Sequence, residues 1–124
     1  METRSLKKEE RLRLRRDFDR VFSKGESVKN EYLRVVFTKN EIGFRRIGVV
    51  VRRKIGKAVY RNRLRRLIKE VFRNNKDIFP ESVDVVFLVR DGLKGMEKGM
   101  NYWKMLEMVR DVLNKMKEEA RWER

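Results

Sequence analysis

The sequence predicts a single compact domain of the α+β class. Its 124 residues are the length of one domain, and such a chain buries roughly two-thirds of the surface that its unfolded form exposes. Apolar residues recur with helical spacing in three segments and alternate with the period of a strand in three others. Because 40% of the residues are hydrophobic and clearly patterned, the 43% that are charged do not indicate disorder.

The first predicted helix is short and basic. Leu14, Phe18, Val21 and Phe22 occupy positions i, i+4, i+7 and i+8, which places them on one face. Gly25 ends the helix, and it can adopt the left-handed conformation that is common after a helix C-terminus.

Three segments alternate as strands do, over residues 32–39, 46–53 and 83–90. Gly43 separates the first two, and the missing side chain of Gly48 permits the close approach of another segment. The third segment is largely apolar on both faces, which is typical of a strand that is covered on both sides.

Two longer helices complete the predicted fold. The first covers residues 58–73, and its apolar residues repeat with a 3.6-residue period: Tyr60, Leu64, Leu67, Ile68, Val71 and Phe72. The second begins at Asn101, which can cap a helix N-terminus, and extends to about residue 120. Its inward stripe is rich in methionine, which indicates core packing rather than a cofactor site: Tyr102, Met105, Leu106, Val109, Val112, Leu113 and Met116.

The net charge of +15 is concentrated in two segments. Residues 1–24, which include a basic N-terminal arm of about residues 1–13, hold nine basic and five acidic residues. Residues 45–73 hold twelve basic residues and one acidic residue, whereas 25–44 and 74–124 are each neutral overall. This asymmetry predicts a surface that binds a polyanion. A merely solvated face is the alternative, and an anionic membrane is disfavoured because aromatic interfacial anchors are not evident.

The composition excludes several kinds of chemistry. The chain has no cysteine and no histidine, and therefore no thiolate nucleophile, imidazole base, or zinc site built from those ligands. The carboxylates of Asp17, Asp19 and Glu70 are scattered among basic residues, so we do not expect a self-sufficient nuclease with two metal ions. No segment is long and apolar enough to span a membrane, and the N-terminal METRSLKKEE lacks a secretory core, so we expect a cytoplasmic protein.

The helix predicted over residues 58–73 carries cations on nearly all of its outer face. Opposite the apolar stripe, or on its shoulders, lie Arg61, Asn62, Arg63, Arg65, Arg66, Lys69 and Arg73. Guanidinium groups bind phosphate bidentately, so this face can grip a sugar-phosphate backbone. The preceding RRKIGK, residues 52–57, lies at the helix N-terminus, where it could contact phosphate. A turn that simply needs glycine would explain that run equally well.

The run RRKIGKAVYRNRLRRLIKE, from Arg52 to Glu70, closely resembles the signature of the protein subunit of bacterial ribonuclease P. Its centre is the RNR sequence at residues 61–63. The resemblance extends upstream through LRLRRDFDRVFSKGESVKN, Leu12 to Asn30, and continues in the order of the predicted elements. It covers most of the chain and weakens after about Arg90.

The resemblance implies a particular fold and function. The fold is helix, three strands, basic helix, strand and final helix, with a left-handed βαβ crossover around the basic helix, where the general rule predicts a right-handed one. The function is to assist a catalytic RNA that removes the 5′ leader of precursor tRNA. The resemblance implies Mg²⁺ held mainly by RNA, with no catalytic side chain, metal ligand or cofactor in the protein. The implied partners are the two RNAs, without a membrane or an obligate protein partner.

The resemblance also implies two sets of binding residues. Those facing the catalytic RNA are Lys54, Lys57, Arg61, Asn62, Arg63, Arg65, Arg66 and Lys69. Those near the pre-tRNA leader are Phe18, Phe22, Val36, Arg52, Arg53 and Arg90, of which Arg52 and Arg53 could reach either RNA.

Two of these assignments depend on the resemblance in particular ways. Without it, Phe18 and Phe22 would be interpreted as core, and with it they are expected to be partly exposed. Val36 stands where some relatives have an aromatic residue, so only apolar contact is expected there. The charge distribution alone would suit a structural, ribosome-type RNA-binding protein equally well.

Overall fold

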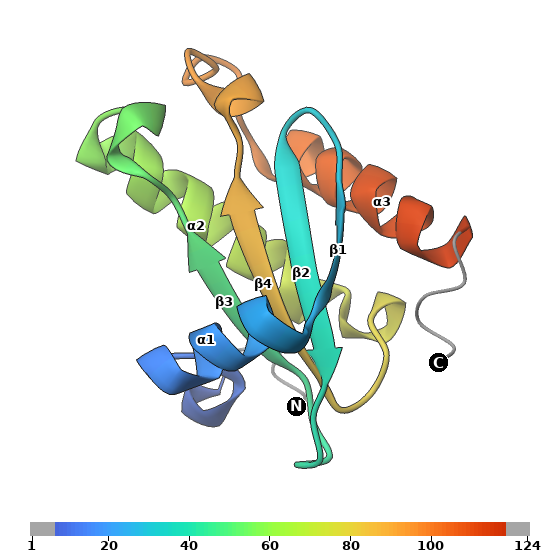
Figure 1. The fold of residues 1–124 in the computed structure, drawn as a ribbon. Coiled ribbons are helices and arrows are strands. Elements are labelled where there is room, and N and C mark those ends of the chain that lie inside the picture. Colours follow the sequence, from blue (N-terminus) through green and yellow to red (C-terminus); the bar gives the residue numbers. More distant parts are fainter. Residues whose placement is uncertain (1–6, 119–124) are drawn as a thin grey trace.

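The computed structural model describes residues 7–118. Within them, three α-helices and four strands follow in the order implied by the resemblance (Figure 1). They are α1 (Arg15–Lys24), β1 (Glu26–Lys29), β2 (Leu33–Lys39), β3 (Arg46–Val50), α2 (Ala58–Asn74), β4 (Val83–Val89) and α3 (Tyr102–Glu118). Short 3₁₀ turns lie at η1 (Lys8–Glu10), η2 (Arg53–Ile55), η3 (Lys76–Ile78) and η4 (Asp91–Leu93).

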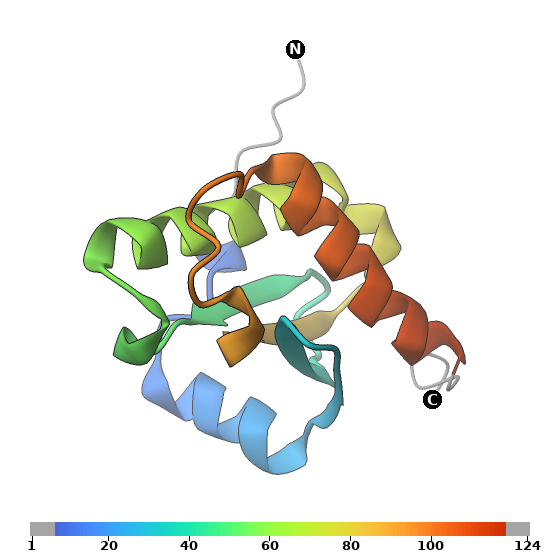
Figure 2. The ribbon, with the colours of Figure 1, turned by 90° about the horizontal axis from the view of Figure 1, so that it is seen from above.

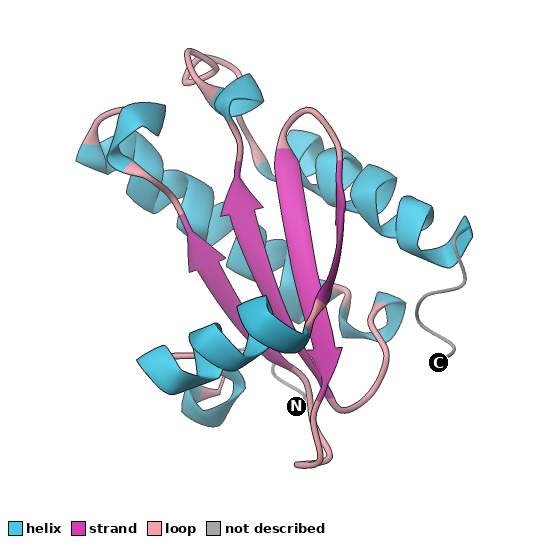
Figure 3. Cartoon of the chain, in the orientation of Figure 1, coloured by secondary structure: helices cyan, strands magenta, loops and turns pink. Residues whose placement is uncertain are grey.

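The four strands form one mixed sheet in the order β1-β2-β4-β3 (Figure 3). β1 and β4 are both antiparallel to β2, and β3 is parallel to β4. Helix α1 covers one face of the sheet, whereas α2 and α3 cover the other (Figure 2). The predicted α+β class is therefore confirmed, with the sheet as the middle of three layers.

The connection between β3 and β4 passes through α2 and is left-handed. In Figure 1 both strands run upward, β4 lies to the right of β3, and α2 lies behind the sheet. Seen from the helix side, the chain therefore moves to the left, against the usual handedness. The crossover that the resemblance implied is confirmed.

The main core lies between the sheet and the pair α2 and α3. The whole predicted stripe of α2 is buried, and so is that of α3, except that Tyr102 is half-buried. Phe79 is buried in this core, with its ring centroid 5.1 Å from that of Phe72 and 6.3 Å from that of Phe87. Burial of such side chains stabilises the fold by about 1.5–3 kcal/mol each, so this packing firmly orients the outer face of α2.

The N-terminus of α3 and the central strand β4 match the sequence prediction. The side-chain oxygen of Asn101 accepts a hydrogen bond of 2.9 Å from the amide of Lys104, as expected of an N-cap. β4 is buried along almost its whole length. The expected end of α3, at about residue 120, lies outside the described residues, as do residues 1–6 of the predicted N-terminal arm.

Two details of the strands differ from the sequence pattern. β1 gives no alternation in the sequence because it has four residues, of which only Val28 is buried. β3 ends at Val50 rather than near residue 53, because the chain turns into η2. The apolar pattern extends beyond the end of the strand because Val51 and Ile55 are also buried.

Gly25 ends α1 but does not adopt the left-handed conformation that glycine permits at this position. Its φ and ψ angles are −80° and 156°, so the backbone is extended. Glycine is needed for another reason: a Cβ atom would lie 2.4 Å from the carbonyl oxygen of Val21 and 2.8 Å from that of Phe37. Gly48 does permit the predicted close approach, since a Cβ atom there would lie 2.6 Å from the ring of Phe18.

Candidate nucleic-acid interface

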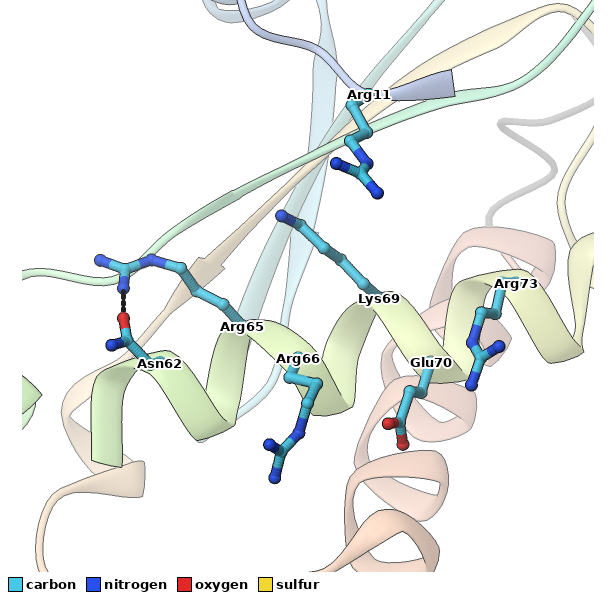
Figure 4. Close-up of a pocket in the computed structure, with 7 residues that line it drawn as sticks. All are labelled: Arg11, Asn62, Arg65, Arg66, Lys69, Glu70 and Arg73. Atoms are coloured by element: carbon cyan, nitrogen blue, oxygen red, sulfur yellow. Dashed lines mark hydrogen bonds between the residues drawn. The ribbon is translucent and has the colours of Figure 1, made fainter. Parts of the chain in front are cut away.

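The outer face of α2 presents the cations that the helical period predicted. Asn62 and Arg66 are exposed, and Arg65, Lys69 and Arg73 are half-buried, because the opposite stripe is packed into the core. Together with Arg11 and Glu70 these residues line a surface groove of about 510 Å³ (Figure 4). We call it the α2 groove.

Arg11 is a residue of the α2 groove that sequence reasoning missed. It comes from the segment before α1 and reaches the groove because its backbone forms a parallel bridge with Ile47 on the outer edge of β3. No local sequence pattern predicts such a bridge, because the two paired segments are far apart in the chain. The only available signal was the excess of positive charge near the N-terminus.

The positive charge of the groove affects the pKa of Lys69. Burial lowers the pKa of its ammonium below the usual value, and the neighbouring charges of Arg11 and Arg65 lower it further. Mutual repulsion of this kind is relieved when an anion binds between the cations.

Three predicted contacts with the catalytic RNA lie outside the α2 groove. Arg63 donates hydrogen bonds to the carbonyl oxygens of Met100 and Glu97, so it holds the chain that leads into α3. Lys54 lies 3.2 Å from a carboxylate oxygen of Asp91. Lys57 is exposed at the residue that precedes α2.

Arg61 also lies beside the groove rather than in it. Its Nε atom donates a hydrogen bond of 3.1 Å to the carbonyl oxygen of Gly56, and the side chain is half-buried. This bond holds the guanidinium beside the N-terminal turn of α2. Gly56 thus contributes a backbone acceptor to the entry turn.

Part of the positive charge of residues 45–73 is balanced inside the fold. Asp84 on β4 has 0% exposure, and Arg46 on β3 binds both of its carboxylate oxygens, at 2.9 and 2.8 Å. Arg20 on α1 and Asn40 bind the same carboxylate. This cluster joins α1 to the sheet, so the net charge overstates the number of cations available to a ligand.

The second surface lies on the face of the sheet that α1 covers. The strand register places Val36, Val86 and Gly48 side by side in one row, and Arg34, Leu88 and Val50 in the next. Helix α1 packs on the first row, where Val36 and Val86 are buried with Leu12 and Val21 of the N-terminal part. In the second row Arg34 is exposed, and Leu88 and Val50 are half-buried.

The open row borders a groove of about 270 Å³, which we call the sheet groove. Its lining combines apolar strand residues with cations: Arg34, Val50, Arg52, Lys54, Leu88, Val89, Arg90 and Asp91. Arg52 and Arg90 therefore converge as expected, whereas Arg53 is exposed within η2 and does not line this groove. Arg34, Val50 and Leu88 were missed, because their place in an open row depends on where α1 stops.

The partial exposure expected of the two aromatic residues is found at both Phe18 and Phe22. Phe22 is 45% exposed and Phe18 is half-buried, with their ring centroids 6.4 Å apart. The assignment of Val36 to the leader surface needs correction. Its side chain is only 3% exposed beneath α1, so a ligand cannot reach it in this arrangement.

The carboxylates considered for nuclease chemistry are separated. Asp17 lies 3.6 Å from Arg46, Asp19 pairs with Arg15, and Glu70 lines the α2 groove. In the part of the chain that the structure describes, no three acidic side chains gather where they could hold a metal ion. Among the same residues, none of the helices has the length and apolar character needed to cross a membrane.

Together, the mixed sheet, the cationic groove on α2 and the apolar and cationic groove on the opposite face define a small α+β protein of the RNA-binding class. The ribonuclease P family model matches residues 6–117. The ribonuclease P protein component of Thermotoga maritima is 41% identical over 114 residues, which are 92% of this chain and 97% of the relative. That of Clostridioides difficile is 43% identical over 90 residues, covering 71% and 73%.

Solved structures agree with the sequence relatives. The ribonuclease P protein from T. maritima has a TM-score of 0.77 at 42% identity, covering 86% of this chain and 96% of that one. The Staphylococcus aureus protein has a TM-score of 0.77 at 31% identity, covering 87% and 95%. The chain belongs to the ribonuclease P protein family. Its function is that of the protein subunit of the ribonuclease P endoribonuclease in tRNA processing. This family membership excludes the alternative of a ribosome-type RNA-binding protein.

Proposed function

We propose that the protein binds the catalytic RNA of ribonuclease P with the α2 groove and the 5′ leader of precursor tRNA with the sheet groove. The observation that carries this proposal is the placement of the two grooves. The first lies along α2, and the second lies on the face of the sheet that carries α1. A single small domain can therefore contact two RNA strands at once.

The chemistry of each groove suits its proposed ligand. The α2 groove is lined mainly by guanidinium and ammonium groups, which bind a structured RNA through its phosphates. We include Arg61 with this surface, and Arg63, Lys54 and Lys57 at its periphery. The sheet groove adds Leu88 and Val50 to its cations, so it can accept both the bases and the backbone of a single strand.

The leader is proposed to continue from the sheet groove toward Phe18 and Phe22. Stacking of a base on an aromatic ring contributes roughly 1–3 kcal/mol and tolerates any base, which suits leaders of variable sequence. Arg52 and Arg90 line the groove and supply charge for the leader backbone, whereas Arg53 is available to either RNA. Val36 is left out because α1 covers it.

We propose that the Mg²⁺ of the holoenzyme is held mainly by RNA. We also propose that the protein acts in the cytoplasm and needs no obligate protein partner. The described residues contain no acidic cluster that fits a metal ion, so no protein ligand is assigned to it. The protein contributes fixed cations beside the RNA phosphates, which lessens the repulsion that Mg²⁺ would otherwise have to offset.

The test is a cleavage assay with a bacterial ribonuclease P RNA at low Mg²⁺. The purified protein should stimulate cleavage, and it should do so more strongly for precursor tRNA with a leader of several nucleotides than for one with a single-nucleotide leader. Equal stimulation of the two substrates would contradict the leader contact, and no stimulation would overturn the whole proposal.

A further inference from the structure

The N-terminal segment and α2 are brought together at one place by backbone pairing. The amide of Leu12 donates a hydrogen bond of 2.8 Å to the carbonyl oxygen of Ile47, and Arg11 bridges the same residue on the edge of β3. Leu12 is buried beneath α1. The backbone of Arg11 is therefore held in place, and its side chain reaches over the outer face of α2 (Figure 4).

Two cations face each other there, one from each segment. In Figure 4, Arg11 and Lys69 point toward each other across the groove. Arg65 lies one helical turn from Lys69 on the same side of α2, but its guanidinium is directed toward Asn62 and away from both. The carboxylate of Glu70 points to the other side of the helix. Within residues 7–118, the guanidinium of Arg11 and the ammonium of Lys69 have no protein acceptor.

Arg65 is held apart from this pair by its own contacts. One terminal nitrogen donates a hydrogen bond of 2.7 Å to Oδ1 of Asn62, and the other lies 3.5 Å from the carbonyl oxygen of Val51. These contacts restrain the guanidinium and leave donors free, because such a group carries five N–H donors. The facing pair of Arg11 and Lys69 is an arrangement suited to one tetrahedral oxyanion.

We propose that Arg11 and Lys69 form a discrete phosphate site that holds one backbone phosphate of the bound RNA between the N-terminal segment and α2. This proposal rests on the proposed function for the RNA, but the site itself is defined by chemistry that a free phosphate shares. Arg11 lies outside the RNR signature, so the site extends the RNA-binding surface to a second segment of the chain. The mutual repulsion of Arg11 and Lys69 in the free protein is relieved when the anion binds.

The first arm of the test measures inorganic phosphate binding to the full chain by calorimetry at low ionic strength. Arg11→Gln and Lys69→Gln should each weaken phosphate binding about tenfold, as expected when a charge-assisted hydrogen bond is lost. Arg110→Gln is the control, because it removes the same charge from the exposed face of α3. Equal weakening by all three variants would overturn the site and leave only net charge as the cause.

The second arm measures affinity for the catalytic RNA. Arg11→Gln and Lys69→Gln should each weaken binding, and their double variant should lose less than the sum of the two single losses, because both residues contact one phosphate. Strictly additive losses would show separate contacts and overturn the shared site. Loss of inorganic phosphate binding with unchanged RNA affinity would overturn the assignment to RNA and make this a site for a free anion.

Further measurements distinguish a failure of this site from a loss of folding and from a failure of the proposed function. Arg11→Lys keeps the charge and should recover most of the phosphate affinity, whereas a purely structural role for the guanidinium would predict no recovery. Unchanged thermal unfolding of each variant excludes a general loss of structure. If replacements of Arg61 and Arg66 weaken RNA binding but those of Arg11 do not, this site fails while the proposed function stands.

Discussion

At the scale of single residues, the arginines of the basic signature differ in what they do. Arg65 and Arg66 line the α2 groove, whereas Arg63 holds the carbonyl oxygens of Glu97 and Met100. Arginine at three neighbouring positions of one helix thus serves both an RNA surface and the packing of the next element. The helical period distinguishes these faces, but it does not reveal the acceptors that each face meets.

Replacement of Arg61 and Arg65 by alanine is expected to weaken binding of the catalytic RNA. The plot of log affinity against log salt concentration should become shallower, by roughly 0.7–0.9 for each lost phosphate contact, because fewer counterions are released on binding. Filter binding at several salt concentrations measures this slope. An unchanged slope would assign both arginines to folding or solvation, and Arg110→Ala serves as the matched control.

At the scale of elements, the position of α1 decides which part of the sheet is open. Asp84 binds Arg20 of α1 and Arg46 of β3, and Arg46 in turn lies 3.6 Å from Asp17 of α1. The ring of Phe18 occupies the space above Gly48. These contacts fix the end of the covered row and therefore the beginning of the sheet groove.

Asp84→Asn is expected to loosen α1 and to impair the leader contact more than the contact with the catalytic RNA. Removal of the buried carboxylate charge should lower the free energy of unfolding by roughly 3 kcal/mol, since two arginines lose their partner. Urea unfolding measures the stability, and cleavage of long-leader and short-leader substrates measures the leader effect. Asp19→Asn is the control, because within residues 7–118 Asp19 pairs only with exposed Arg15, at 3.8 Å. This control should change stability by less than about 1 kcal/mol. A selective loss of catalytic-RNA affinity would contradict this account.

At the scale of the whole molecule, an ion pair joins the segment before α1 to the turn that follows the C-terminus of α2. Glu10 is buried, and its carboxylate lies 2.6 Å from the ammonium of Lys76 in η3. Burial raises the pKa of Glu10, but its hydrogen bonds to Lys76 and to the amide of Lys7, with the charges of both lysines, bring the pKa below its usual value.

This lowered pKa predicts a specific loss of stability in acid. The contribution of the ion pair is complete above the ordinary pKa of glutamate, about 4.3, and it disappears as the pH falls through the lower value of the folded protein. The contribution should not exceed about 1 kcal/mol, because Lys76 remains partly solvated. Urea unfolding of the protein and of Glu10→Gln between pH 3 and pH 7 measures it. The two stability curves should converge at low pH, and a constant separation would refute the prediction.

Much of this protein is determined by local sequence. The stripe of α2, the Asn101 cap and the buried strand β4 follow from side-chain periods and hydrogen-bonding chemistry within a few residues. The RNR signature is likewise contiguous, so the amino-acid sequence alone indicates the family. Such features are predictable because their causes lie within one helix or strand.

Only the tertiary structure decided how distant segments meet. The pairing of Arg11 with Ile47 completes the α2 groove, and the packing of α1 buries Val36 while it leaves Arg34 open. Asp84 balances Arg46, so not every cation of the basic segment faces a ligand. These outcomes depend on strand register and on the end of α1, which arise from contacts between segments far apart in the chain and leave no periodic signal in it.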